Sequence, residues 1–228
     1  MATYLSVVNS VLRRLREREV SSVNNTFYSR LVGELVNDVK REVEDAHNWT
    51  HLRDTVQIAT QNGVFRYTLE GAGRRFRILE DYNGKPSVFN DTDDVPLMKA
   101  PSSRWMTRQL NENDTTPGRP HWFDINGFDD DGDPIVDLFH IPDDVYEINF
   151  DIIAPQDNLL TNGNDDDTII KVPSQPVILG AWSRSIYERG EDNGYLSDLA
   201  YRDFQAALAD AISWDMSNSS DNRDWYVV

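Results

Sequence analysis

The acidic segment Asp129-Asp130-Asp131-Gly132-Asp133 is the clearest candidate for a metal site in the sequence. Alternate carboxylates in a short loop can converge on one hard cation such as calcium. The EF-hand pattern is incomplete, however, because the glycine comes too early, no glutamate closes the loop, and strand patterns flank it. We therefore interpret the segment as a solvated hairpin loop rich in turn-forming residues, and the acidic segment 162–167 in the same way.

A glycine-rich segment and two pairs of histidines are further candidates for binding sites. Gly71-Ala72-Gly73 opens like a dinucleotide-binding fingerprint, but the third glycine is missing and a strand pattern follows, so a connection between strands is predicted. His47 and His51 have the i, i+4 spacing of zinc ligands, but the glutamate of H-E-x-x-H is absent and the helix is expected to end there. His121 and His140 are expected to face each other across paired strands without forming a site.

No catalytic nucleophile stands out, because the chain has no cysteine and no serine in a G-x-S-x-G pattern. The 39 acidic residues outnumber the 22 basic ones and give a net charge of −17, so an isolated pair of carboxylates says little about acid–base catalysis. We therefore predict that the protein is not an enzyme and needs no cofactor and no metal. No run approaches the roughly 18 apolar residues of a membrane helix, so no membrane partner is expected.

Basic residues cluster at one place, where Arg13, Arg14, Arg16 and Arg18 lie at the end of the first predicted helix. Cations near a helix C-terminus interact favourably with the helix dipole, which is the simplest role for this cluster. Contact with DNA or with an acidic neighbour is the alternative. The overall negative charge argues against a protein that grips nucleic acid, since phosphate binding needs clustered lysine and arginine.

Two helices are predicted in the N-terminal part of the chain, and they would position several of these residues. After a plausible N-cap at Thr3, apolar residues recur at helical spacing up to Leu15. A second, longer helix is predicted to end near residues 47–49. Its apolar stripe lies opposite a polar face that carries Lys40, Arg41 and Glu44, and comprises Tyr28, Val32, Leu35, Val39, Val43 and Ala46.

The pattern changes to a period of two residues from about residue 55, as expected for strands. Asn62-Gly63 between two alternating runs predicts a β-hairpin. The clearest strand runs from 146 to 152. A short helix near Trp105 is predicted, capped by Ser102 or Ser103.

The helical period returns near the end of the chain. Ser174 is a plausible cap for a helix with Pro176 in its first turn, and Gly190 is a natural stop. Ile178, Trp182 and Ile186 share a face of this helix. The last helix carries one apolar side made of Tyr201, Phe204, Leu208, Ala211 and Ile212.

Each helical stripe must be buried against something, and the economical solution packs the first two helices on the last two. We therefore predict an α+β fold, in which an antiparallel helix bundle (residues 1–51 and 173–216) carries an inserted antiparallel β domain (52–172). Residues 217–228 are predicted to form a C-terminal tail.

Both helical ends of the chain resemble a known family. Val8-Asn9-Ser10-Val11-Leu12-Arg13-Arg14-Leu15, followed by Glu19-Val20-Ser21-Ser22-Val23, resembles the opening of the podophage tail tubular protein A family, the head-to-tail adaptors. In that family a short helix ends at a Gly-Glu-x-x-Val element, and a long second helix finishes at an aromatic residue, as at Trp49 here. The next-to-last helix, with Ala181, Arg184 and Tyr187, is also similar, whereas Arg16 replaces the usual glycine.

The resemblance implies a structural subunit of a podovirus virion, made in the host cytoplasm and placed in the tail or neck. It implies a homo-oligomeric ring, a dodecamer, between the portal protein and a tail nozzle similar to tubular protein B. DNA would pass through the lumen during ejection without sequence-specific binding. Two other classes stay open: a carbohydrate-binding or tail-fibre-type module, which would use the aromatic residues of the β region, and a lytic tail enzyme.

The tail is the candidate binding segment. Seven polar residues, 217–223, form a flexible spacer, and the segment beyond them ends in Trp225, Tyr226, Val227 and Val228. Exposed apolar groups usually mark an interaction site. We therefore predict that these four residues dock on the portal or on a neighbouring subunit; folding back onto the bundle is the alternative.

Overall fold

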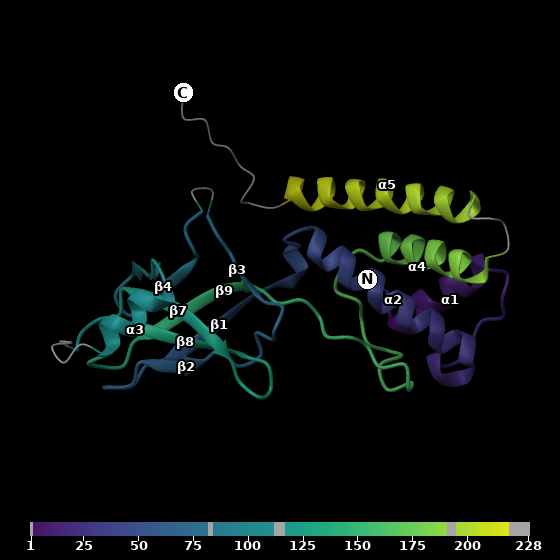
Figure 1. Ribbon diagram of the computed structural model, residues 1–228. Coiled ribbons are helices and arrows are strands. Elements are labelled where there is room, and N and C mark those ends of the chain that lie inside the picture. Colours follow the sequence, from purple (N-terminus) through teal and green to yellow (C-terminus); the bar gives the residue numbers. More distant parts are fainter. Residues whose placement is uncertain (1, 82–83, 112–116, 191–194, 219–228) are drawn as a thin grey trace, which may run out of the picture. The chain divides into compact units, whose positions relative to one another are not determined.

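The computed structural model describes residues 2–81, 84–111, 117–190 and 195–218 (Figure 1). The chain divides into two compact units. Met1–Leu52 and Gln156–Val228 form the helical unit, and Arg53–Pro155 form the β unit. Within the described ranges, no helix combines the length and apolar character needed to cross a membrane.

The helical unit is built around α4, which packs against the other three long helices of the unit. Short 3-10 turns, η1 (Val23–Asn25) and η2 (Thr50–Leu52), lie before and after α2. The helices are α1 (Tyr4–Arg14), α2 (Phe27–Ala46), α4 (Ser174–Arg189) and α5 (Tyr195–Asn218).

Helix termini follow several of the sequence signals. Thr3 caps α1, since its hydroxyl accepts a hydrogen bond from the Ser6 amide, and this prediction is confirmed. Gly190 ends α4 in the left-handed conformation, with a φ of 64°, as predicted. The predicted cap at Ser174 is wrong: Pro173 takes the N-cap position and no side chain caps the helix, because Ser174 is already its first residue.

Gly180 allows α4 to approach its neighbours closely. A Cβ atom at this position would lie 2.5 Å from Cγ1 of Val39 in α2 and 3.1 Å from Cδ2 of Phe204 in α5. Any side chain would therefore push the three helices apart. The crossing of α2, α4 and α5 depends on this glycine.

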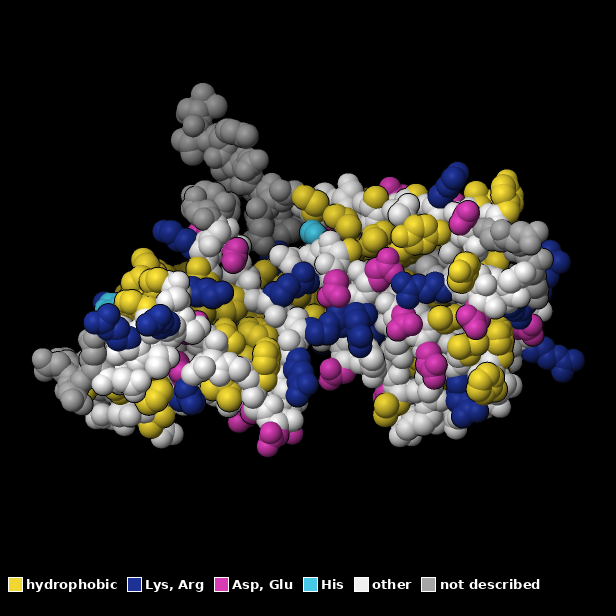
Figure 2. Space-filling view, viewed as in Figure 1, with side chains coloured by type: hydrophobic (Ala, Val, Ile, Leu, Met, Phe, Trp, Pro, Cys, Tyr) yellow, Lys and Arg dark blue, Asp and Glu magenta, His cyan; other side chains and the backbone are white. Residues whose placement is uncertain are grey.

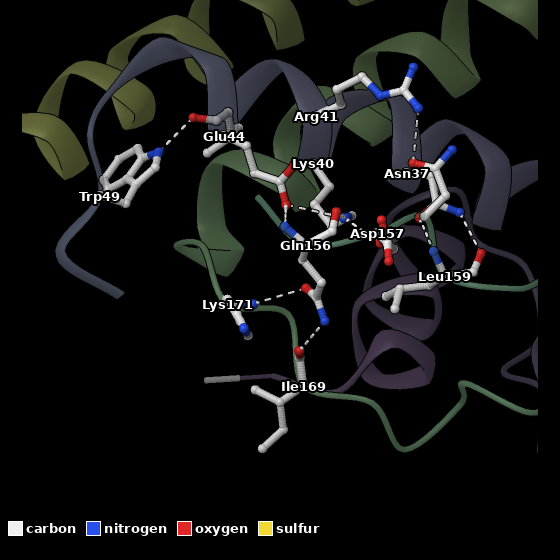
Figure 3. Close-up of polar contacts among 12 residues, drawn as sticks. Asn37, Lys40, Arg41, Glu44, Trp49, Gln156, Asp157, Leu159, Ile169 and Lys171 are labelled. Carbon is white, nitrogen blue, oxygen red and sulfur yellow. Dashed lines mark hydrogen bonds and ion pairs between the residues drawn. The ribbon is translucent and has the colours of Figure 1, made fainter. Parts of the chain in front are cut away.

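The segment that returns from the β unit is held against α2 by buried polar side chains (Figure 3). Lys40 Nζ donates to the carbonyl oxygens of Gln156 and Asp157 at 2.6 and 2.8 Å, and forms an ion pair with Glu44 at 3.1 Å. Asn37 binds both the amide and the carbonyl of Leu159. Lys40 and Glu44 are completely buried, so the polar face predicted for them is wrong.

Residues 156–172 consequently belong with the helices, although the sequence analysis placed them in the β domain. The apolar residues of this segment do not recur at helical spacing, so the sequence pattern did not assign it to the helices. Its backbone amides and carbonyls nevertheless need hydrogen-bond partners. Side chains of α2 supply those partners. The acidic segment 162–167 also contributes, because Asp166 accepts a hydrogen bond from the Val23 amide at 3.1 Å.

The β unit contains two sheets. The first has the strand order β1-β9-β4-β5, with β3 also on β9, and the second has the order β2-β8-β7-β6. All pairs are antiparallel except β6 with β7, which is parallel and departs from the purely antiparallel domain that was predicted. The strands are β1 (Arg53–Ala59), β2 (Arg66–Thr68), β3 (Arg77–Ile78), β4 (Val88–Asn90), β5 (Val95–Pro96), β6 (Met98–Lys99), β7 (Trp122–Phe128), β8 (Pro134–Phe139) and β9 (Glu147–Ile153).

Apolar residues of both sheets share one core. The ring centroids of Phe123 in β7 and Phe150 in β9 lie 5.6 Å apart in an edge-to-face arrangement. Helix α3 (Ser103–Asn111) lies on the second sheet, and its first turn is capped by Ser102, whose hydroxyl accepts from the Trp105 amide. This capping prediction is confirmed.

The predicted hairpin at Asn62-Gly63 is wrong, although the turn itself exists. Gly63 has a φ of 79°, and the Val64 amide donates to the Gln61 carbonyl. However, β1 pairs with β9 and β2 pairs with β8, so the chain passes from one sheet to the other at this turn. Turn chemistry is local, whereas strand pairing is decided by the distant apolar residues that each strand packs against.

Candidate functional site

Helix α5 leaves most of its surface uncovered. Its fully buried residues within the described chain are Ser197, Ala200 and Phe204, which face the rest of the unit. One exposed stripe, which we call the α5 flank, repeats every three or four residues and consists of Leu199, Asp203, Ala206, Asp210 and Trp214. Trp214 is 72% exposed.

Figure 2 shows apolar side chains along the visible surface of α5. Asp203 and Asp210 make no ion pair with any residue that the structure describes. The exposed apolar groups along this 24-residue helix make it a candidate interaction surface.

A basic pocket of about 480 Å³ lies at the N-terminal end of α5. The Arg14 guanidinium lies 5.5 Å from the centre of the Trp182 ring, a cation–π arrangement. Arg189 donates to the Glu17 carboxylate and to the Tyr28 hydroxyl. The basic pocket is lined by Arg14, Leu15, Arg16, Trp182, Ile186, Arg189 and Leu196.

Two arginines of the predicted cluster have partners in the structure, and two make no ion pair with a described residue. Arg13 forms an ion pair with Glu19 at 3.0 Å, and Arg14 lies on Trp182. Arg16 and Arg18 are exposed and make no ion pair with a described residue. The helix-dipole role therefore suits Arg13 and Arg14, the last residues of α1, but does not account for Arg16 and Arg18.

Arg16 adopts the backbone conformation that glycine would favour. Its φ is 60°, its amide donates to the Arg13 carbonyl, and the Glu17 amide donates to the Leu12 carbonyl. These two bonds form a Schellman motif, whose left-handed position is usually glycine. The end of α1 thus keeps its geometry with an arginine in the strained position.

We expect Arg16→Gly to raise the free energy of unfolding by about 1 kcal/mol, because a left-handed conformation costs a non-glycine residue about that much. The gain corresponds to a Tm increase of about 2–4 °C, measurable by calorimetry. Arg18→Gly is the matched control, since Arg18 does not have a positive φ. An equal or smaller Tm for Arg16→Gly than for Arg18→Gly would contradict this explanation.

A second, apolar pocket of about 390 Å³ lies at the C-terminal end of α5. Its lining includes Trp49, Pro173, Trp214 and Asn218, the last residue of α5. The Trp49 indole donates to the Val43 carbonyl at 2.6 Å, which fixes the aromatic residue predicted to follow the second helix. Helix α5 therefore ends at the rim of this pocket, and Ser217 and Asn218, which were predicted to begin the tail, belong to the helix.

The glycine-rich and acidic segments bind each other. Both carboxylate oxygens of Asp133 accept backbone hydrogen bonds, from the Gly71 and Gly73 amides at 2.9 Å each. Asp129 accepts from the amides of Gly132 and Asp133 at 2.8 Å. The prediction of a hairpin loop between two strands is confirmed, since 129–133 connect β7 and β8. Gly71-Ala72-Gly73 connects strands, as predicted.

The histidines lie at the ends of elements. His47 terminates α2, as predicted, and its Nε2 lies 3.1 Å from the Asp215 carboxylate. The His121 and His140 rings are 5.8 Å apart, and burial, with Arg119 and His140 nearby, lowers the pKa of His121. Among the described residues, no three histidine, aspartate or glutamate side chains are grouped to hold a metal ion.

Sequence reasoning missed the α5 flank and the basic pocket. Trp182 and Ile186 were assigned to a packing face, but both are only half-buried. Trp214 falls outside the apolar side predicted for the last helix. A tryptophan on the predicted polar side was the signal in the sequence that could have indicated the α5 flank. Residues 225–228, the predicted docking segment, lie outside the described residues.

Two comparisons with known proteins bear on these surfaces. A family model described as SU10 adaptor protein matches residues 2–225, almost the whole chain. A search of curated proteins gives no match.

Proposed function

The chain belongs to the SU10 adaptor protein family of phage head-to-tail adaptors, and from this premise we propose that it forms a ring between the portal and the tail nozzle. The family makes it a structural component of the phage tail or neck, which assembles with portal and tail components, rather than a member of an enzyme class. The proposal includes the ring and its twelve subunits, a podovirus as the phage, and a nozzle similar to tubular protein B.

The exposed surface of α5 is the observation that best supports assembly. Among the described residues of the subunit, nothing covers the exposed parts of Leu199, Trp214 and their apolar neighbours. Burial of apolar surface is the main favourable term in most protein–protein association. A ring gives every subunit two neighbours and covers such surfaces without an open end.

The negative charge suits a DNA channel. Each subunit carries a net charge of −17, and like-charge repulsion would keep DNA from adhering to the lumen wall while it passes during ejection. This role needs no sequence-specific contact with the bases.

Negative-stain electron microscopy of the purified protein, alone and with portal-bearing particles, tests the proposal. We expect rings, either free in solution or attached at the portal vertex. Absence of rings and of attachment under both conditions would reject it. Specific glycan binding by the β unit would instead favour the tail-fibre alternative.

We propose further that the helical unit is an independently folding bundle into which the β unit is inserted. Replacing 53–155 with a short Gly-Ser linker should leave a helical protein that melts cooperatively, because α1, α2, α4 and α5 pack on one another. Circular dichroism melting provides the measurement. A broad, non-cooperative transition or an insoluble product would show that the helices need the β unit.

A further inference from the structure

The helical unit has unpaired charges of opposite sign on two separate surfaces. Arg16 lines the basic pocket and Arg18 lies two residues further along the exposed loop, whereas Asp203 and Asp210 lie on the α5 flank. None of the four makes an ion pair with a described residue. Each surface also carries a tryptophan that is at least partly exposed: Trp182 in the pocket and Trp214 on the flank.

One copy cannot bring these two surfaces together. Leu196, on α5, lines the basic pocket, and a helix rises 1.5 Å per residue, so Asp203 and Asp210 lie about 10 and about 21 Å further along the axis. An arginine side chain is too short to cross the longer of these distances. Among the described residues of the same copy, Arg16 and Arg18 have no ion-pair partner, and the carboxylates of a second copy would supply one.

We propose that the basic pocket of one copy binds the α5 flank of a second copy. The flank supplies carboxylates to the arginines and apolar groups to Trp182 and Ile186, so both charge and apolar character are complementary. Because the two surfaces differ, the contact is head-to-tail, and it closes into a ring if the rotation permits. This contact rests on the proposed function, because it would join neighbouring subunits of the proposed ring.

A second copy fits the basic pocket better than DNA does. Arg13 is paired with Glu19 and Arg189 with Glu17, so few cations are available for phosphates. DNA would also leave Leu199 and Trp214 of the α5 flank uncovered, whereas an amphipathic helix laid on the pocket would cover apolar groups on both sides.

Two charge-reversed variants of the full chain test the contact. The pocket variant carries R16D and R18D, and the flank variant carries D203R and D210R. Aspartate tolerates the left-handed conformation of Arg16, and arginine is a good helix former, so both variants should keep the wild-type Tm. Like charges would face each other in either variant alone, and we expect subunit association to weaken about 100-fold or more.

A mixture of the two variants should assemble. The reversed pocket of one variant then meets the reversed flank of the other, and the unchanged surfaces meet as in the wild type, so the copies alternate around the ring. Native mass spectrometry measures whether each ring contains equal numbers of the two variants, as alternation requires, and electron microscopy shows the rings, both in solution and on portal-bearing particles. K85D with K99D, on exposed residues of the β unit, is the charge-matched control and should assemble like the wild type.

Several outcomes would overturn the inference. Either variant assembling like the wild type would do so, as would a mixture that fails to assemble while the wild type succeeds. Loss of duplex DNA binding by the pocket variant, with subunit association unchanged, would assign the pocket to nucleic acid instead. If a reversal prevents folding, the neutral variant R16N with R18Q replaces it and should associate about tenfold more weakly. A wild type that neither assembles nor attaches to portal-bearing particles would instead reject the proposed function itself.

Discussion

Glu44→Ala is expected to lower the free energy of unfolding of the helical unit by about 3–5 kcal/mol, because it leaves the Lys40 ammonium buried without its counter-charge. The change also removes the acceptor for the Gln156 amide, which donates to Glu44 Oε1 at 3.2 Å. Both losses act on the segment that returns from the β unit. Urea unfolding followed by circular dichroism at 222 nm measures the difference.

Glu34→Ala provides the control on the same helix. Glu34 is exposed, and surface substitutions of this kind usually change stability by less than about 0.5 kcal/mol. A loss below about 1 kcal/mol for Glu44→Ala would mean that water reaches Lys40, and that the buried pair does not hold residues 156–159 on α2. Lys40→Met should resemble Glu44→Ala, since it leaves Glu44 charged and the Gln156 and Asp157 carbonyls without their donor.

The buried Lys40–Glu44 pair also shows why sequence patterns identified the helices but not all of their contacts. Periodicity placed Val32, Val39 and Val43 correctly, and each of them is fully buried. The same rule assigned Lys40 and Glu44 to solvent, since charged residues are rarely buried unless paired. Their partners are backbone groups more than 100 residues away, and no local pattern contains that information.

The β unit shows the same division between local and distant information. The turn at Asn62-Gly63, the loop 129–133 and the Ser102 cap each depend on a few adjacent residues, and these were predictable. The pairing of β1 with β9 joins residues such as Arg53 and Ile153, which are far apart in the sequence, and alternation alone gives no partner. The candidate surfaces were hidden for a related reason: the pattern of a single chain assigned Trp182 to a packing face, and it gave Trp214, outside the predicted apolar side of its helix, no partner.

Removing residues 224–228 is expected to weaken attachment to the portal by about 30-fold or more per aromatic anchor lost, since such anchors contribute about 2 kcal/mol each at an interface. Ser217 and Asn218 belong to α5, so the polar residues expected to give Trp225 and Tyr226 the reach to bind outside their own helical unit are 219–223. Attachment is measured with immobilised portal protein. Repetition around a ring would amplify the loss through effective concentration, so monomeric and assembled forms should be measured separately.

The Tm of the truncated monomer distinguishes docking from self-packing. If the tail binds the portal or a neighbouring subunit, the monomer should melt within about 1 °C of the full chain, because no core contact is lost. If the tail instead occupies the apolar pocket beside Trp49 and Trp214, the truncated monomer will melt several degrees earlier, and the docking prediction fails. Asn222→Ala with Arg223→Ala is the control, since spacer substitutions should change neither attachment nor Tm.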